Sequence, residues 1–387
     1  MKILHISYEF GDSSAVFRLA KNQCREGHAV YIYCKRGLFC LSRLRFVNIN
    51  RFRLFWYLVL NRLDSWLGRA LTEDISVFCS PSLTPSGLPS YVTRRSWDIV
   101  HIHWIASNFC SPMSALRIRA KAFLHLHDLW LLNGLVPHSS DSVHLSKIGR
   151  ALQRFSRNRF ETIIKKFDPI LLAPSSWSMD QAQAQTGRSV SIRIWPGTVP
   201  GMFRPGPSDA LHHWPRGRLR LLQVMSGQYP VSKGVDVIIK SLIAIPVEVA
   251  QSISLTIVGS DTEAMMCVNR VQVRFLRTAT EGEMVSLYRA ANFTLIWSKA
   301  ETFSQSAVES LSCGTPIITH SGLPCSNFCR VSEGSVVAQS GTVDSCENAL
   351  LHAIRMASER SAQRSLYHPE VVTASSTSLY LANCPAQ

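Results

Sequence analysis

The sequence predicts an α/β protein with two doubly wound parallel-sheet domains. Short apolar segments alternate with amphipathic ones, which is the pattern of strands and helices around a parallel sheet. The pattern restarts once, after a segment dense in proline and glycine (residues 196–207), which reads as a linker. The chain has 387 residues, more than one hydrophobic core usually holds, and 46% of them are hydrophobic. We therefore expect domains over residues 1–200 and 201–365.

The first domain opens with a strand–helix–strand unit, the building block of a parallel sheet. Residues 2–8 (KILHISY) are expected to form a strand buried on both faces, and residues 29–34 (AVYIYC) the next strand. Between them, residues 16–28 form an amphipathic helical pattern that closes at Gly27. Residues 11–15 (GDSSA) are expected to form the turn before this helix.

Polar residues end the other strands of the first domain. These strands are expected over residues 98–104, 122–128 and 169–175. Ligands bind at the carboxyl ends of strands in open parallel sheets. His103, His127 and Asp128 stand at such ends, so they are candidate site residues.

The second domain repeats the alternation without an obvious sequence repeat. Strands are expected over residues 219–227, 253–260, 273–276, 293–298 and 315–320. Helices are expected over residues 233–245, 280–291 and 302–314. This order again predicts a doubly wound sheet.

An insert over residues 36–93 carries many basic and aromatic side chains and few acids. Its front part holds Arg36, Arg43, Arg45, Arg51, Arg53, Arg62 and Arg69, with Phe39, Phe46, Phe52, Phe55, Trp56, Tyr57 and Trp66. A basic, aromatic, amphipathic segment is typical of a helix that lies on a membrane surface. The alternative is a solvated helix that packs its aromatic side chains inward. Residues 147–166 form a second basic stretch with the same ambiguity.

The net charge indicates which partners the protein can bind, and the cysteine pattern indicates its cellular compartment. The formal net charge of +15 attracts anions, such as an anionic membrane surface or phosphorylated substrates. Nucleic acid is not expected, because no recognition motif accompanies the charge. The eleven cysteines form no CxxC pair, which favours reduced thiols in the cytoplasm. We expect neither a signal peptide nor a membrane-spanning helix, since the most apolar stretch, residues 54–60, is far too short.

Residues 299–318 (KAETFSQSAVESLSCGTPII) place two glutamates eight residues apart around an expected helix start. Buried carboxylates without partners are costly, so each one lies on a surface or faces a group that needs it. If the helix begins at Phe303 or Ser304, Glu301 lies in the loop before it and Glu309 about two turns inside. The first-turn amides then form an anion site that suits a diphosphate. Glu309 would accept hydrogen bonds from ribose hydroxyls.

This stretch resembles the Glu-x7-Glu motif of retaining glycosyltransferases of the GT-B fold, in particular glycosyltransferase family 4. The family pattern E-x-F-G-x-x-x-x-E-A-x-A-x-G-x-P-V-V is matched by Glu301, Phe303, Glu309, Cys313, Gly314 and Pro316. Ser304 stands where the family has glycine. The resemblance implies that Phe303, Ser304, Gln305 and Glu309 bind the donor and that Glu301 contacts the donor sugar.

Other stretches extend the resemblance over most of the chain, except residues 36–93. Residues 226–242 (SGQYPVSKGVDVIIKSL) resemble G-R-x-x-x-x-K-G-x-D-x-L-I-x-A-x, whose lysine contacts the donor diphosphate. Lys233 matches that lysine, whereas Gln228 stands where the family has arginine. Residues 366–387 resemble the helix that ends such chains and packs back on the first domain.

In the first domain, His127 aligns with a family histidine that contacts the transferred sugar. His103 and Asp128 resemble family strand ends that face the acceptor, and for Asp128 we expect an orienting or capping role. Three residues, Gly11, Ser13 and Ser14, match a loop whose amides approach the phosphates or the acceptor. The alternatives are histidines satisfied at strand ends and an ordinary strand–helix turn.

The resemblance implies two Rossmann-like doubly wound domains facing across a cleft. It also implies transfer of a hexose from a nucleoside diphosphate sugar with retained anomeric configuration, with His127 and Glu301 as catalytic residues. Lys233 and the helix-start amides would stabilise the leaving diphosphate. No Asp-x-Asp pair stands where a catalytic metal would bind, so we expect no metal and no other cofactor. The expected acceptor is a lipid-linked saccharide or polysaccharide made at the inner face of a membrane.

Two alternatives stay open from the sequence. One is another GT-B enzyme, such as a sugar-nucleotide epimerase or a phosphorylase, although no lysine stands out for the pyridoxal phosphate of a phosphorylase. The other is a non-catalytic GT-B protein that serves as a binding or scaffolding subunit. Gln228 and Ser304 favour that protein, whereas the intact Glu301 and Glu309 with Lys233 disfavour it.

Overall fold

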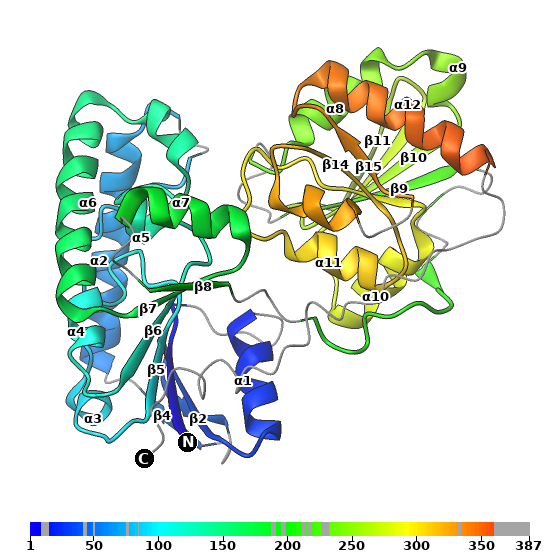
Figure 1. The fold of residues 1–387 in the computed structure, drawn as a ribbon. Helices are drawn as coiled ribbons and strands as arrows, with labels where there is room; N and C mark the ends of the chain where they lie inside the picture. Colours follow the sequence, from blue (N-terminus) through cyan, green and yellow to red (C-terminus); the bar gives the residue numbers. More distant parts are fainter. Residues whose placement is uncertain are drawn as a thin grey trace. The chain divides into compact units, whose positions relative to one another are not determined.

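The computed structural model places most of the chain in two compact units, whose boundary falls between residues 194 and 199 (Figure 1). The structure describes residues 1–8, 15–41, 45–48, 51–74, 77–83, 85–186, 191–194, 199–210, 214, 218–225, 232–330 and 334–359. Each unit is an α/β domain around a mostly parallel sheet, so the predicted fold class of two doubly wound domains is confirmed. The described part of the expected linker, residues 199–207, forms no helix or strand. The C-terminal helix expected over residues 366–387 lies outside the described residues.

The sheet of the first unit has the strand order β4-β3-β2-β1-β5-β6-β7-β8. Its strands are β1 (Lys2–Ile6), β2 (Ala29–Cys34), β3 (Gly37–Cys40), β4 (Arg45–Asn48), β5 (Ile99–Ile102), β6 (Lys121–His125), β7 (Ile170–Ala173) and β8 (Ile192–Ile194). The pairs from β2 through β1 to β8 are parallel, whereas β3 and β4 extend the β2 edge in antiparallel fashion. All five strands predicted in this domain are present, and β3, β4 and β8 were not predicted.

Helices cover both faces of this sheet (Figure 1). They are α1 (Ala15–Arg25), α2 (Arg51–Leu71), α3 (Ser90–Thr93), α4 (Pro112–Leu116), α5 (Trp130–Asn133), α6 (Lys147–Phe167) and α7 (Ser176–Thr186), with a 3₁₀ helix η2 (Ser139–His144). Side chains alternate along β1, so Ile3 belongs to one buried cluster with Leu19 of α1, while Leu4 belongs to another with Ile163 of α6. His5 lies on the same side of the sheet as Ile3, facing α1. The histidine cluster described below lies on that side because of this alternation.

The long helix α2 of the insert packs one face inward and leaves its aromatic face exposed. Asp64 is buried and accepts hydrogen bonds from the Ser80 hydroxyl and the Ser82 amide, both at 2.6 Å. A Cβ on Gly68 would lie 2.0 Å from the carbonyl oxygen of Cys79, so the helix touches that backbone directly. Among the aromatic side chains of α2, Tyr57 is buried and the others are exposed: Phe52, Phe55, Trp56 and Trp66. Inward packing of the aromatic face, the alternative drawn from the sequence, is therefore wrong.

The sheet of the second unit has the order β11-β12-β10-β9-β13-β14-β15. Its strands are β9 (Leu219–Val224), β10 (Ile253–Val258), β11 (Ala264–Val268), β12 (Val271–Leu276), β13 (Phe293–Leu295), β14 (Ile317–His320) and β15 (Val336–Ala338). Its helices are α8 (Val235–Ala244), α9 (Val247–Ala250), α10 (Glu281–Ala290), α11 (Gln305–Ser312) and α12 (Val343–Glu359), with a 3₁₀ helix η4 (Pro324–Arg330). The strands and helices predicted here are present, whereas α9, β11, β15 and α12 were not predicted.

The edge strand β11 pairs antiparallel with β12, and the other strand pairs of this sheet are parallel. Met265, Met266 and Cys267 on this edge are exposed. The sequence analysis did not predict a strand here, although residues 264–268 (AMMCV) form an uninterrupted apolar run.

Candidate functional site

A lysine and a carboxylate meet in the loop before α11. The Lys233 Nζ donates a hydrogen bond to Glu301 Oε1 at 2.5 Å, and the Ser298 hydroxyl donates to the same oxygen at 2.8 Å. The side chains are only partly exposed, 29% for Lys233 and 15% for Glu301. An ammonium group has three donors, so Lys233 can hold Glu301 and an anionic ligand at the same time.

Gly234 fixes the position of Lys233. Its φ of 70° is left-handed, and a Cβ there would lie 1.8 Å from the carbonyl oxygen of Trp297. Such a close approach admits glycine alone. The Lys233 carbonyl also accepts a hydrogen bond from Gln223 Nε2 at 3.1 Å. The segments that follow β9 and β13 are therefore tied to the start of α8, at the carboxyl edge of the sheet.

Helix α11 begins at Gln305, after Ser304 in the left-handed conformation with φ 74° and ψ 72°. Glu301 lies in the loop before the helix, as expected. Glu309 is four residues after Gln305, so it lies about one turn inside rather than two. The left-handed backbone gives a physical reason for glycine in the family pattern at the position of Ser304, because glycine takes this conformation without steric strain.

Glu309 is buried and held by side chains of two helices. Its exposed fraction is 8%. Its Oε2 accepts a hydrogen bond from the Tyr288 hydroxyl of α10 at 3.2 Å, and its Oε1 accepts from Gln305 Nε2 at 3.4 Å. Phe303 is also buried, and its ring packs edge-on against Phe328 at 5.8 Å. The structure thus gathers Lys233, Glu301 and Glu309 around the start of α11. The predicted positions Gln228, Gly11, Ser13 and Ser14 lie outside the described residues.

The first unit holds a cluster of five histidines on the α1 side of its sheet. His5 comes from β1, His101 and His103 from β5 and its end, and His125 and His127 from β6 and its end. His103 Nδ1 lies 2.8 Å from His127 Nε2, and His103 Nε2 lies 2.9 Å from His5 Nδ1. His5 Nε2 lies 2.7 Å from the Gln23 carboxamide oxygen on α1. A hydrogen-bonded chain therefore runs from α1 across three strands to His127.

The direction of this chain follows from its first member. The Gln23 oxygen can only accept, so His5 carries its proton on Nε2 and accepts at Nδ1. His103 then donates from Nε2 and accepts at Nδ1, where the His127 Nε2–H donates. Burial lowers the pKa of His5 and of His127 to about 4, and it lowers the pKa values of the other three histidines well below 6.5. At neutral pH the five rings are therefore uncharged.

Asp128 turns to the opposite side from His127. Its carboxylate accepts hydrogen bonds from Trp104 Nε1 at 2.8 Å and from the Trp130 amide at 2.9 Å. Burial raises the pKa of Asp128 to about 6, although both hydrogen bonds act to lower it. Two donors thus hold the Asp128 carboxylate in place, while its orienting or capping role stays a prediction.

Sequence reasoning singled out His103 and His127 and missed the other members of the cluster. A signal was present, because His101 and His103, like His125 and His127, are spaced by two and so share one face of a strand. The register pairs His5 with His101 across β1 and β5, which the sequence did not determine. Nothing in the sequence marked Gln23 as a hydrogen-bond partner of these histidines.

Residues 220–365 match the model of the family of glycosyl transferases group 1. The resemblance stated from residues 226–318 is thereby confirmed, and the match covers most of the second unit.

One curated relative is a D-inositol 3-phosphate glycosyltransferase from Catenulispora acidiphila. It is 24% identical over 245 residues, which cover 57% of this chain and 55% of the relative. The chain therefore spans about half the length of the curated relative that it matches.

Solved structures share the fold over nearly the whole chain. Sucrose-phosphate synthase from Thermosynechococcus elongatus superposes with a TM-score of 0.64 at 14% identity, covering 98% of both chains. HepE from Anabaena in complex with UDP-glucose superposes with a TM-score of 0.56 at 14% identity, covering 93% of this chain and 90% of its own. At such identities the likeness shows a shared GT-B fold and no shared substrate.

Proposed function

We propose that this protein transfers a hexose from a nucleoside diphosphate sugar to a lipid-linked or polysaccharide acceptor, with retention of anomeric configuration. The observation that carries the proposal is the arrangement at the start of α11. Lys233 is hydrogen-bonded to Glu301 there, and Glu309 lies one turn inside the helix. This arrangement sits within the segment that matches the glycosyl transferases group 1 family.

The proposed roles follow from charge. A leaving diphosphate carries negative charge, which Lys233 and the first-turn amides of α11 neutralise. The Glu309 carboxylate is an acceptor only, so it is suited to the two hydroxyls of a ribose. Glu301 accepts hydrogen bonds from the sugar hydroxyls, and His127 contacts the transferred sugar. These positive groups replace a catalytic metal in the proposal, and no other cofactor takes part.

A thermal-shift panel tests donor binding. UDP, GDP, ADP and CMP are added to the full chain, to Glu309→Ala and to the control Glu248→Ala, which changes an exposed glutamate of the same unit. A ligand that binds only the folded state raises the melting temperature. We expect one nucleoside diphosphate to stabilise the wild type and the control but not Glu309→Ala. No shift with any nucleotide would instead favour the non-catalytic binding subunit.

A donor identified in this way allows the transfer itself to be tested. Proton NMR of the product with the corresponding nucleotide hexose and a saccharide acceptor reports the anomeric configuration directly. We expect the configuration of the donor in the product and the same rate in excess EDTA. An inverted product or a loss of rate in EDTA would contradict the proposed chemistry.

We further propose that α2 docks the protein on an anionic membrane at its inner face, where the acceptor is made. The exposed residues Phe52, Phe55, Trp56, Val59, Leu63 and Trp66 follow helical spacing and form one face of α2. Trp66 is 66% exposed and Phe52 is 68% exposed, which is unusual for large apolar side chains. Arg51, Arg62 and Arg69 of the same helix are exposed as well. Apolar insertion with flanking arginines suits anionic lipid.

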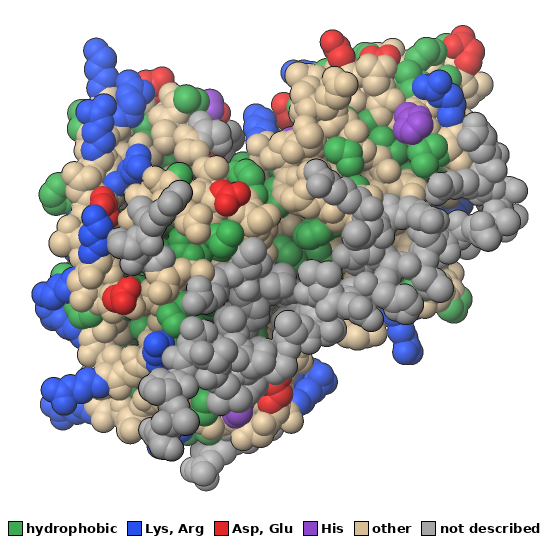
Figure 2. All heavy atoms as spheres, in the orientation of Figure 1, with side chains coloured by type: hydrophobic (Ala, Val, Ile, Leu, Met, Phe, Trp, Pro, Cys, Tyr) green, Lys and Arg blue, Asp and Glu red, His purple; other side chains and the backbone are tan. Residues whose placement is uncertain are grey.

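Helix α6 adds positive charge to the same unit. Lysine and arginine side chains gather along the α6 edge of the first unit in Figure 2. The exposed ones of α6 are Lys147, Arg154, Arg157, Arg159, Lys165 and Lys166. The start of α6 is joined to the end of α2, because the Ser146 amide donates to the Leu71 carbonyl at 2.9 Å. Among the described residues, no helix is both long and apolar enough to cross a membrane.

Vesicle sedimentation tests the docking face. We expect the chain to bind vesicles that contain phosphatidylglycerol, more weakly at high salt, and to bind neutral phosphatidylcholine poorly. Phe52→Ser with Trp66→Ser should weaken binding about 10-fold or more, because two exposed aromatic side chains that would insert into the lipid are lost. The control Ile243→Ser changes an exposed apolar residue of the second unit. Equal binding by both variants would contradict the docking face.

A further inference from the structure

We propose that His103, His125 and His127 form a zinc-type metal site at the carboxyl edge of the first sheet. This site is separate from the donor chemistry proposed for the second unit. Each of the three histidines offers one ring nitrogen, and these nitrogens lie within 4.8 Å of one another. Three imidazoles are a sufficient protein ligand set for zinc, with water in the fourth position.

The backbone brings these rings together. His125 and His127 lie two residues apart at the end of β6, so both point to the same face, and their rings stack at 4.1 Å. His103 follows the neighbouring parallel strand β5, and its ring centroid lies 5.0 Å from that of His127. Two ligands from one strand and a third from its neighbour thus converge without a flexible loop between them.

The hydrogen bond between His103 and His127 marks where an ion would enter. His103 Nδ1 and His127 Nε2 lie 2.8 Å apart and share one proton. Zinc–nitrogen bonds of about 2.1 Å in a tetrahedron require about 3.4 Å between ligand nitrogens, so a small rotation of the His103 and His127 rings separates these two nitrogens enough. Binding would move the shared proton to Nδ1 of His127, leaving both rings uncharged and both facing nitrogens as ligands.

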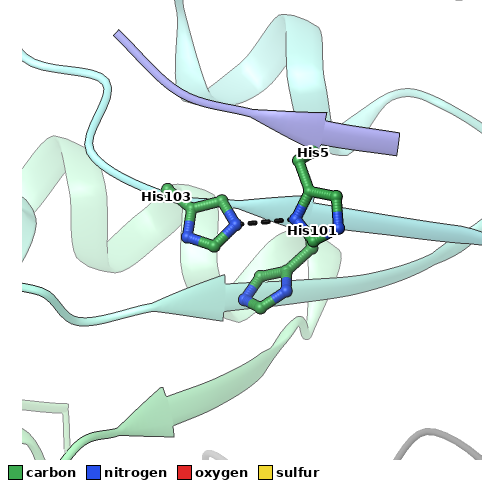
Figure 3. Close-up of side chains that lie close together, drawn as sticks. All are labelled: His5, His101 and His103. Atoms are coloured by element: carbon green, nitrogen blue, oxygen red, sulfur yellow. Dashed lines mark hydrogen bonds between the residues drawn. The ribbon is translucent and has the colours of Figure 1, made fainter. Parts of the chain in front are cut away.

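A second shell for this site is already present. The His103 Nε2–H donates to His5 Nδ1 (Figure 3), and His5 in turn donates to the Gln23 oxygen. Hydrogen bonds on the far nitrogen fix the tautomer and orientation of a ligating imidazole and raise its basicity. The chain from Gln23 therefore keeps the Nδ1 lone pair of His103 directed at the site.

Burial distinguishes this outer group from the inner histidines. His5, His101 and His103 also have nitrogens within 4.8 Å of one another, and Figure 3 shows their rings gathered between β1 and β5. His5 and His101 are completely buried. A divalent ion there would have neither water nor a carboxylate ligand, which is costly. His125 and His127 are only partly buried, so the outer group gives the ion an entry path and a water ligand.

Metal binding would act on the proposed transfer. A ligated His127 is held by the ion and no longer available to a donor sugar. We therefore expect zinc to inhibit hexose transfer, with EDTA restoring the rate. The binding itself is measured without any substrate, so a failure of the transfer proposal leaves the metal proposal testable.

Cobalt titration of the untagged full chain is the direct test. Cobalt(II) in a tetrahedral nitrogen site absorbs visible light, and zinc should abolish that absorption by displacement. We expect one cobalt per chain, with affinity lowered more than about 100-fold in His125→Gln and in His127→Gln. Gln23→Leu should lower the affinity about 10-fold by removing the second shell. His352→Gln, at an exposed histidine of the second unit, is the matched control and should bind normally.

The fold of each variant is checked by near-ultraviolet circular dichroism. Absence of cobalt absorption with folded wild-type protein at micromolar metal would overturn the proposal. Loss of binding in folded His101→Gln with full binding in His125→Gln would move the ion to the inner group and overturn the assignment as well.

Discussion

The two candidate sites of this molecule use opposite electrostatics at equivalent places in their folds. Both lie at the carboxyl edge of a parallel sheet. The second unit gathers charged groups there: Lys233 Nζ and Glu301 Oε1 are joined at 2.5 Å, and Glu309 lies about one turn inside the helix that follows Glu301. The first unit gathers five uncharged imidazoles, three of them almost completely buried. This difference shows that the edge of the sheet determines where a site lies, whereas its side chains determine whether the site is sensitive to pH or to ligands and salt.

That contrast predicts different sensitivities. A buried neutral imidazole gains a proton when the chain unfolds in acid, so the stability of the first unit should depend on pH. The stability of the second unit, with its partly exposed ion pair and the proposed anion site, should instead depend on ligands and salt. The four predictions below test this contrast, from the largest expected effect to the smallest.

Mild acid should unfold the first unit selectively. Burial lowers the pKa values of the five clustered histidines below 6.5, so their contribution to stability is present above pH 6.5 and is lost as pH falls. On unfolding below pH 6.5, His5, His101 and His103 each take up a proton. Together they should lower the unfolding free energy by up to about 4 kcal/mol for each pH unit of acidification. Asp128, whose pKa is raised to about 6, acts in the opposite direction. Between pH 6 and about 4 it is protonated in the folded chain only, so it cancels the loss of stability caused by one histidine.

Urea unfolding at pH 7, 6 and 5 measures this effect, with one probe in each unit. The second unit has His320, whose pKa is lowered by burial, and should lose much less stability. Equal loss in both units, or no loss, would break the comparison.

Gly234→Ala should destabilise the second unit alone, by about 3–5 kcal/mol, because it combines a left-handed backbone with overpacking. The added methyl group would meet the Trp297 carbonyl at 1.8 Å. Gly27→Ala is the control in the first unit, with φ of 85° and nothing within 4 Å. Its expected loss is only about 1 kcal/mol, from backbone strain. Calorimetry with two resolved transitions distinguishes the units, and a loss of similar size for both variants would contradict the close contact.

Glu309→Gln should separate ligand binding from stability in the second unit. The substitution keeps the shape of the side chain and removes the charge that the proposed ribose contact uses. We expect transfer to fall about 30–100-fold, the size of one charge-assisted hydrogen bond, and the melting temperature to change little. The rate at saturating and limiting donor measures this effect. Unchanged rates would mean that Glu309 serves the fold instead of the donor.

Ser304→Gly should stabilise the second unit by up to about 1 kcal/mol, since glycine takes φ of 74° without steric strain. Ser306→Gly is the matched control inside α11, where glycine should destabilise by about 0.5–1 kcal/mol. Chemical unfolding of both variants measures the two signs. A loss in both would show that Ser304 makes a contact worth more than its backbone strain.

Much of the fold followed from the sequence because the buried strands carry an unambiguous pattern. Strands β1, β2, β7, β9 and β10 are apolar runs between turn signals, and their packing agrees with their local preference. Strand β11 (AMMCV) is also an apolar run but was not predicted. Four of its side chains are exposed, unlike those of a buried strand, and its pairing with β12 determines its conformation. The aromatic residues of α2 were seen, but their outward direction depends on Asp64 and Gly68, whose partners are distant in sequence.

The two candidate sites differed in how far the sequence predicted them. Glu301, Glu309 and Lys233 belong to motifs with fixed spacing, so they were found directly. The histidine cluster depends on the register between β1, β5 and β6, which single-strand patterns do not determine. The pairing of His103 with both His5 and His127 therefore needed the structure. The helix start at Gln305 was predicted within two residues, and this difference moves Glu309 by at most about half a turn.

The exposed edge strand β11 also gives the second unit a site for selective chemical labelling. Among the described cysteines, Cys267 is the one whose side chain is exposed, and it stands beside Met265 and Met266. A maleimide fluorophore should therefore react at this edge in preference to the buried thiols, and its emission would report on the second unit. The same exposure makes the two thioethers early targets of peroxide, so purified protein kept in air would first change in mass at this strand.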